Sequence, residues 1–148
     1  MGGSRRPLLP MDAKYITYHS TANPRSTAQN ERDYLVNVAN TRQASFHIAV
    51  DDKEAVECIP LNEVAWANGD GYYGTGNRES ISIEICESGD RVKTIQNAIK
   101  VGHKIMREQG ITQIRRHYDW SGKDCPRIMS ANNWEKWHEF LREVQNGI

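Results

Sequence analysis

The chain has 148 residues, of which 38% are hydrophobic and 26% charged, as expected for one globular domain. Its 19 basic and 19 acidic side chains balance without blocks of like charge, so we expect no nucleic-acid partner and no binding to an anionic membrane surface. No apolar run approaches the roughly 18–20 residues of a membrane span, and three cysteines are too few for a disulfide scaffold.

Residues 1–13 contain Arg5 and Arg6 without an apolar stretch after them, which predicts an irregular lead-in rather than a secretory signal. Residues 14–148 then form one domain without internal repeats or linkers. The three cysteines cannot all pair, so we expect synthesis in a reducing cytoplasm, without a signal peptide. We also expect a monomer.

The first predicted strand covers residues 14–19, where Ile16 and Tyr18 share one face and His19 lies on the other. A helix follows, from a capping box of Ser26 and Gln29 to about Asn40. Its apolar stripe would consist of Tyr34, Leu35 and Val38.

Residues 45–50 alternate again, with Phe46, Ile48 and Val50 on one face and His47 on the other. Residues 56–61 are the expected hairpin partner of this strand, and 67–78 form a glycine-rich loop.

The clearest strand covers residues 80–86, where three buried isoleucines alternate with Ser82, Glu84 and Cys86. Long apolar periodicity predicts a helix over about 90–109, and a last helix starts after Ser130. The order of elements indicates an α/β fold with a central mixed sheet flanked by helices. If the non-apolar strand faces coincide, His19, His47 and Glu84 line one cleft.

The segment from His117 to Cys125 places an imidazole and a thiol eight positions apart, and these are donors that Zn²⁺ prefers. With His19 they would supply three ligands and leave a fourth position open, as in catalytic zinc sites. The alternative is a pair of structural histidines and a buried free thiol. Against it, Cys125 lies in a polar turn that contains Lys123, whereas structural cysteines are normally surrounded by apolar residues.

Glu84 is the candidate general base, because an acid between isoleucines in a central strand is unusual unless it faces a polar cavity. Glu87 shares the parity of the buried isoleucines but lies where the strand ends, so it is expected at the surface. Lys123 could stabilise an oxyanion, the alternative being an ordinary exposed lysine. His47 could contact substrate or be a sheet-face histidine, and Trp66 could stack on a sugar or peptide.

Gly69 to Gly74 formally matches the dinucleotide-binding pattern of glycines. A strand rather than a helix follows, so no helix N-terminus would receive a pyrophosphate. We interpret the segment as a substrate-contacting loop.

Four strings, 18–23, 45–51, 76–86 and 117–126, resemble the type 2 N-acetylmuramoyl-L-alanine amidases, which share the T7 lysozyme and peptidoglycan recognition protein fold. The similarity is greatest to endolysins of Bacillus-type phages and prophages, over about residues 15–137. It implies Zn²⁺ on His19, His117 and Cys125, catalysis by Glu84 and Lys123, and bacterial peptidoglycan as substrate. Substrate contacts are expected from His47, Trp66, Asn77 and Arg78.

The chain departs from the family pattern at two places. Phe46 stands where T7-like members use a catalytic tyrosine, which places more weight on Glu84. Ala67 and Asn68 stand where many relatives have His-Ala, so the loop histidine that helps to hold substrate is absent.

The resemblance implies a zinc hydrolase that cuts the amide between N-acetylmuramic acid and L-alanine and that reaches the cell wall after release from the cytoplasm. A peptidoglycan-binding module without catalysis is the main alternative, and the presence of Cys125 favours the enzyme. A third possibility is a thiol-dependent peptidase that uses Cys125 and His117.

Overall fold

The computed structural model describes residues 5–147 and contains a five-stranded sheet in the order β3-β2-β4-β1-β5. Its strands are β1 (Tyr15–Ser20), β2 (Ile48–Val50), β3 (Ala55–Glu57), β4 (Ser80–Ile85) and β5 (Gln113–Arg116). All neighbours pair in parallel except β2 and β3, which form an antiparallel hairpin. The predicted mixed α/β sheet is therefore confirmed.

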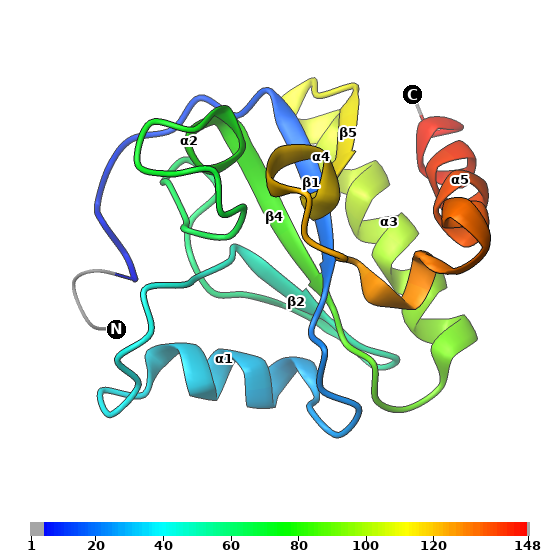
Figure 1. Ribbon diagram of the computed structural model, residues 1–148, viewed down its shortest axis with the longest axis horizontal. Helices are drawn as coiled ribbons and strands as arrows, with labels where there is room; N and C mark the ends of the chain where they lie inside the picture. The colour runs from blue at the N-terminus through cyan, green and yellow to red at the C-terminus, as the bar shows by residue number, and fades with distance from the viewer. Residues whose placement is uncertain (1–4, 148) are drawn as a thin grey trace.

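The helices form two layers, one on each side of this sheet (Figure 1). The helical elements are α1 (Ala28–Val36), α2 (Thr75–Glu79), α3 (Arg91–Gln109), α4 (His117–Ser121), the short 3₁₀ turn η1 (Arg127–Met129) and α5 (Ala131–Gln145). Helices α3 and α5 pack on one face of the sheet, and α1 covers β2 and β3 on the other. Among the described residues, no helix combines the length and apolarity needed to cross a membrane.

The alternation of β1 and β4 assigns their faces correctly. Ile16, Tyr18, Ile81 and Ile83 are fully buried in the main core beneath α3 and α5. The opposite parity places His19 beside Glu84 on the other face, because the two residues are register partners. One face of the sheet therefore builds the core, and the other carries the polar side chains.

The prediction for the first helix was partly wrong. The helix is capped one residue later than expected, by Thr27, whose hydroxyl accepts from the backbone of Asn30. It also ends at Val36, and Leu35 alone of its predicted apolar stripe is buried, whereas Tyr34 and Val38 are exposed. The amphipathic pattern thus predicted that a helix forms, but not which of its apolar side chains are buried.

Other boundaries also differ from the expectation. Strand β2 begins only at Ile48, and the expected loop 67–78 contains the start of α2. Strand β5 and helix α4 were not predicted, because Gln113–Arg116 offers a single buried apolar residue, Ile114. Helix α3 matches the prediction, with Asp90 as its N-cap and Gly110 in the left-handed conformation at its C-terminus.

Residues 5–13 contain no helix or full strand, only a bridge between Pro10 and Glu63. They are nevertheless fixed to the domain. The buried Arg5 donates to the backbone oxygens of Leu35 and Asn37, both at 3.0 Å. These contacts satisfy carbonyls at the C-terminal end of α1, where a helix leaves them without internal partners.

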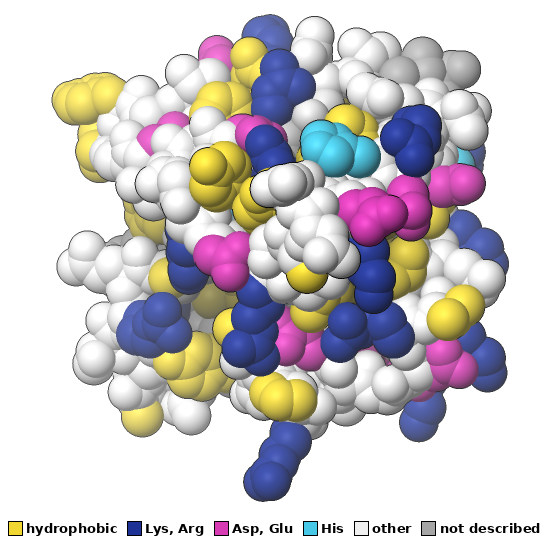
Figure 2. Space-filling view, turned by 45° about the vertical axis from the view of Figure 1, so that its right-hand side comes forward, with side chains coloured by type: hydrophobic (Ala, Val, Ile, Leu, Met, Phe, Trp, Pro, Cys, Tyr) yellow, Lys and Arg dark blue, Asp and Glu magenta, His cyan; other side chains and the backbone are white. Residues whose placement is uncertain are grey.

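Charged side chains are interspersed on the face shown in Figure 2, where dark blue and magenta groups lie next to one another across the middle. Ion pairs within the described chain follow the same pattern. Arg116 Nη2 lies 2.7 Å from Asp119 Oδ1, and Lys104 pairs with Glu108 one helical turn away. This face therefore carries no band of a single charge sign.

Candidate metal centre

The site begins with the register between β1 and β4. His19 is the fifth residue of β1, and its partner in the neighbouring parallel strand is Glu84. Paired residues of parallel strands point to the same face of the sheet. The His19 imidazole and the Glu84 carboxylate therefore lie side by side near the carboxyl ends of β1 and β4. Both residues line the same cleft of about 180 Å³.

The remaining donors come from the segment after β5, which pairs with β1 on its other side. Helix α4 begins with His117 directly where β5 ends, so the histidine is placed by the sheet itself. Gly122 then ends α4 in the left-handed conformation, and the chain turns back. Tyr118 N–H donates to the Cys125 carbonyl oxygen at 3.1 Å, which holds the cysteine beside His117.

The predicted trio is brought together. His19 Nδ1 lies 3.1 Å from His117 Nδ1 and 3.8 Å from Cys125 Sγ, and the three ligand atoms all lie within 4.8 Å of one another. All three side chains are buried. A tetrahedral Zn²⁺, with Zn–N of about 2.0–2.1 Å and Zn–S of about 2.3 Å, sets its donors roughly 3.3–3.6 Å apart. The residues present therefore fit a zinc ion.

The histidines are held in the form that binds a metal. Burial, followed by the neighbouring His117 ring, lowers the pKa of His19 well below its ordinary value. Burial, and then the charge of Lys123, lowers the pKa of His117 to about 4. Both rings are thus neutral at physiological pH, and each retains a lone pair for an ion.

The thiol has a different state. Burial, and then the nearby Glu84 carboxylate, raises the pKa of Cys125 to about 12. Without an ion the sulfur keeps its proton, which a divalent cation would have to displace on binding. A nucleophilic cysteine needs the opposite shift, so this environment disfavours the thiol-dependent peptidase.

Glu84 and Lys123 line the same cleft as the trio. Burial, and then the charge of Glu31, raises the pKa of Glu84 to about 8, while Lys123 opposes this shift. Lys123 itself is exposed, at the mouth of the cleft. The arrangement places a carboxyl group that can exchange protons near neutral pH beside the candidate metal ligands.

The prediction that His47 lines the cleft is wrong. Its side chain is 0% exposed and is not among the cleft-lining residues. Nε2 lies 2.7 Å from the backbone oxygen of Glu63, and Nδ1 accepts from the Ser82 N–H at 2.9 Å. Because both ring nitrogens bind backbone, His47 joins the strand β4 to the segment that contains Glu63 and has no nitrogen left for a substrate.

Of the other predicted substrate residues, Trp66 and Asn77 border a hollow and Arg78 does not. Trp66 lines the cleft and also a neighbouring hollow, which Asn77 and Tyr72 border as well. Asn77 is buried, and both ends of its side-chain amide bind the loop. Its Oδ1 accepts from the Asn68 N–H, and its Nδ2 donates to the Gly71 oxygen.

Arg78 lies outside both hollows, with its guanidinium 5.1 Å from the Tyr72 ring centroid. Cation–π contact of this kind fixes the orientation of the tyrosine. The geometry therefore gives Asn77 and Arg78 roles in shaping the loop.

Sequence reasoning missed two arginines in the cleft wall. Arg42 and Arg127 both line it. Arg127 makes a two-pronged ion pair with Glu87, whose side chain is only 4% exposed, so the expectation that Glu87 is a surface residue is wrong. The position of Arg127, two residues after Cys125, was the available signal.

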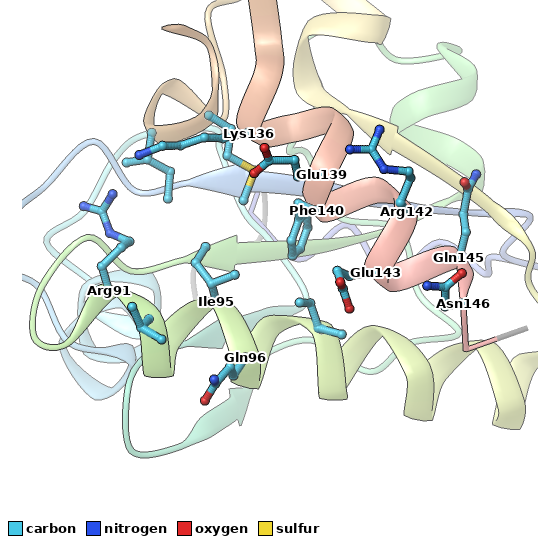
Figure 3. A pocket seen from close by; sticks show the side chains of 14 residues that line it. Arg91, Ile95, Gln96, Lys136, Glu139, Phe140, Arg142, Glu143, Gln145 and Asn146 are labelled. Carbon is cyan, nitrogen blue, oxygen red and sulfur yellow. The ribbon is translucent and has the colours of Figure 1, made fainter.

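A larger groove, of about 780 Å³, lies between α3 and α5 and contains none of the candidate site residues. Figure 3 shows Ile95 of α3 and Phe140 of α5 facing its interior, with the charged ends of Arg91 and Lys136 at its edge. The groove is thus separate from the metal centre, and no histidine or cysteine of the described residues lines it.

Comparison with known proteins gives a consistent result. A protein-family model described as N-acetylmuramoyl-L-alanine amidase matches residues 9–128. The N-acetylmuramoyl-L-alanine amidase CwlA of Bacillus subtilis (strain 168) is 49% identical over 132 residues, covering 84% of this chain and 47% of CwlA. The chain therefore spans about half the length of that relative.

Two solved structures superpose closely on the fold. The catalytic domain of XlyA has a TM-score of 0.88 at 39% identity, and the match covers 97% of this chain and 94% of that one. PlyL has a TM-score of 0.86 at 42% identity, with coverage of 99% and 91%.

Proposed function

This chain belongs to the N-acetylmuramoyl-L-alanine amidase family, and from that premise we propose that it is a zinc-dependent amidase that acts on bacterial peptidoglycan. The bond cut is the amide between the lactyl group of N-acetylmuramic acid and the L-alanine of the stem peptide, as in the catalytic domain of an endolysin. The observation that carries the proposal is the convergence of His19, His117 and Cys125 in the cleft that Glu84 lines.

A zinc ion held by these three donors would act as a Lewis acid on the scissile carbonyl and make a nearby water acidic enough to attack at neutral pH. Glu84 accepts the proton of that water as its oxygen bonds to the carbonyl carbon. The same carboxyl group returns the proton to the nitrogen as the carbon–nitrogen bond breaks. Lys123, at the cleft mouth, stabilises the negative charge that develops on the carbonyl oxygen.

Trp66 is the proposed contact for the glycan or stem peptide. It joins the cleft to the neighbouring hollow, and its ring lies 5.5 Å from that of Tyr72. Two adjoining aromatic rings offer a flat apolar surface with a polar edge, which suits the face of a sugar ring. We place the substrate along this pair, with the scissile amide beside Glu84.

The test is to treat purified bacterial cell walls with protein that has been dialysed against a chelator, and then to restore Zn²⁺. We expect lysis to stop without metal and to return with it, accompanied by free N-terminal L-alanine. Lysis that persists without metal would contradict the zinc mechanism, and new reducing sugar ends would contradict an amidase. Wall binding without new amino groups, with or without zinc, would identify the non-catalytic binding module.

A Cys125→Ser variant serves as the matched control for metal removal. It replaces the sulfur donor by a weaker oxygen ligand at nearly constant volume. We expect it to bind less zinc and to lyse walls poorly at zinc concentrations that saturate the unmodified protein.

A further inference from the structure

Asn68 is a buried amide next to the metal centre. It is 0% exposed and lies in the loop between Trp66 and α2. Its Nδ2 donates to the Gly76 oxygen at 2.6 Å, and its backbone N–H donates to Asn77 Oδ1 at 2.8 Å. Its Oδ1 is buried and has no hydrogen-bond partner among the described residues. A buried amide oxygen without a partner is costly, by about 1–3 kcal/mol, so it calls for an explanation.

His19 contains the complementary unpaired atom. Its Nδ1 faces His117 and Cys125, whereas its Nε2 is buried and also lacks a partner within the described chain. The Asn68 side chain is the hydrogen-bonding neighbour that favours a proton on this ring and so partly opposes the fall in the pKa of His19. The Asn68 and His19 side chains are therefore neighbours, and Asn68 Oδ1 and His19 Nε2 are each buried without a hydrogen-bond partner among the described residues.

The loop also lies against the second histidine. A Cβ placed on Gly69 would come within 3.5 Å of His117 Nε2, and the backbone of Asn68 favours a proton on that ring. Asn68 and Gly69 thus border the outer side of both imidazoles, opposite the nitrogens that converge on the candidate ion.

We propose that Asn68 is the positioning residue of the metal centre, its Oδ1 accepting the Nε2–H of His19 so that the Nδ1 lone pair is free for Zn²⁺. A neutral imidazole has one N–H, and an ion on Nδ1 requires that proton on Nε2. Partners of this kind fix the ring and typically change metal affinity by about 10–100-fold. The inference rests on the proposed zinc function.

The simpler explanation is that Asn68 only fastens its loop through Gly76 and Asn77. Two substitutions separate the explanations. Asn68→Leu and Asn68→Asp both remove the Nδ2 donor to Gly76, and the aspartate also brings a carboxylate oxygen towards that carbonyl. Only Asn68→Asp keeps an acceptor for His19. A fastening role therefore predicts that aspartate is at least as harmful as leucine, whereas positioning predicts the reverse.

The measurement is the equilibrium Zn²⁺ affinity by competition with a chromophoric chelator, with thermal unfolding of the metal-free proteins to check folding. We expect Asn68→Leu to bind zinc about 10–100-fold more weakly than the unmodified chain and Asn68→Asp to bind at least 10-fold more tightly than Asn68→Leu. Equal losses in both variants, or a loss under threefold in Asn68→Leu, would overturn the proposal. Failure of the unmodified protein to bind zinc would instead overturn the proposed function.

If Asn68→Leu does not fold, the zinc-loaded unmodified protein decides the matter. Zinc on Nδ1 already requires the His19 proton on Nε2, so the test is whether long-range ¹H–¹⁵N spectra show that Nε2–H protected from exchange with solvent. A rapidly exchanging Nε2–H would overturn the role of Asn68, whereas a proton on Nδ1 would overturn the proposed zinc ligation.

Discussion

His19 and Glu84 are register partners on adjacent parallel strands, so a proposed metal ligand and the proposed base are positioned by backbone pairing. Neighbouring strands lie about 4.8 Å apart, and side chains of equal parity leave the sheet in the same direction. The relation between these two groups therefore does not depend on a loop. It follows from the hydrogen bonds between β4, the middle strand of the sheet, and its neighbour β1.

Substitution of the base should separate chemistry from metal binding. We expect Glu84→Gln to lower the rate of stem-peptide release by about 10²–10⁴-fold, because an amide cannot accept the water proton. Zinc content should remain near one ion per chain. The isosteric change Glu57→Gln, on the exposed strand β3 of the same sheet, is the control and should change the rate little. A Glu84→Gln enzyme with more than a tenth of the original rate would exclude this role.

His47 should make the fold sensitive to mild acid. Burial lowers the pKa of His47 to about 4, against an ordinary value of 6.5, and its Nδ1 must stay unprotonated to accept from Ser82. Between those pH values His47 is protonated in the unfolded chain and neutral in the folded chain. The free energy of unfolding therefore falls as the pH falls from 6.5 to 4. The loss attributable to this residue is about 3 kcal/mol.

The measurement for His47 is urea unfolding at several pH values, with His47→Gln for comparison. The variant should be less stable at pH 7, and its deficit relative to the original chain should shrink towards pH 4. A deficit that stays constant over this range would show that His47 does not titrate as a buried neutral group.

Asp51 should stabilise the connection between β2 and α1. Burial alone would raise the pKa of its carboxyl group, but backbone N–H donors of Ala28, Lys53 and Glu54 outweigh burial and lower the pKa overall. A lowered pKa means that the stabilisation is complete above the unfolded value, near 4, and is lost as the pH falls through the folded value.

We expect Asp51→Asn to cost about 1–3 kcal/mol at pH 7, because the amide nitrogen cannot accept one set of these bonds. Denaturant unfolding at pH 7 and at pH 3 measures the effect. The difference between the two proteins should be smaller at the lower pH, and an unchanged difference would contradict the assigned cause.

Gly102 should be intolerant of a side chain although it lies inside α3. Alanine normally favours a helix by about 1 kcal/mol over glycine. Here a Cβ would overlap the hydroxyl of Tyr18, which donates to the Ala98 oxygen at 2.9 Å. We therefore expect Gly102→Ala to lower the free energy of unfolding by about 1–3 kcal/mol.

Removal of the hydroxyl provides the test of that contact. In a double-mutant cycle, Gly102→Ala should cost less in the Tyr18→Phe background than in the original chain. Additive effects of the two substitutions would show that the overlap with Tyr18 is not the cause.

Sequence patterns predicted the elements that bury a regular stripe and failed where burial is irregular. Alternation identified the correct faces of β1 and β4 because four isoleucines and a tyrosine define the core side. Strand β5 was missed because its pairing with β1 contributes only Ile114 to the core. Here tertiary pairing outweighs a local pattern that Arg115 and Arg116 make strongly polar.

The candidate site shows the same division. Donor chemistry and turn composition made His19, His117 and Cys125 candidates, the family resemblance selected them, and the structure brings their ligand atoms within 4.8 Å of one another. His47 has the parity expected of a cleft residue, yet the backbone around Glu63 covers it. Alternation reports which way a side chain leaves the sheet and contains no information on what lies above it.

Asn68 could not have been identified from sequence as a neighbour of His19, since the contact depends on how α2 and its loop fold over β1. Asn68 donates two hydrogen bonds within the loop, to the Gly76 oxygen and to Asn77 Oδ1, and these fix that course.

The long separation between the donors also bears on biosynthesis. His19 precedes His117 by 98 positions and Cys125 by 106. A ribosome delivers the first donor early and the other two only after most of the polypeptide has emerged. A nascent or prematurely terminated product that ends before α4 thus carries only His19 of the three proposed donors, and would lack the proposed zinc site until its last quarter is made.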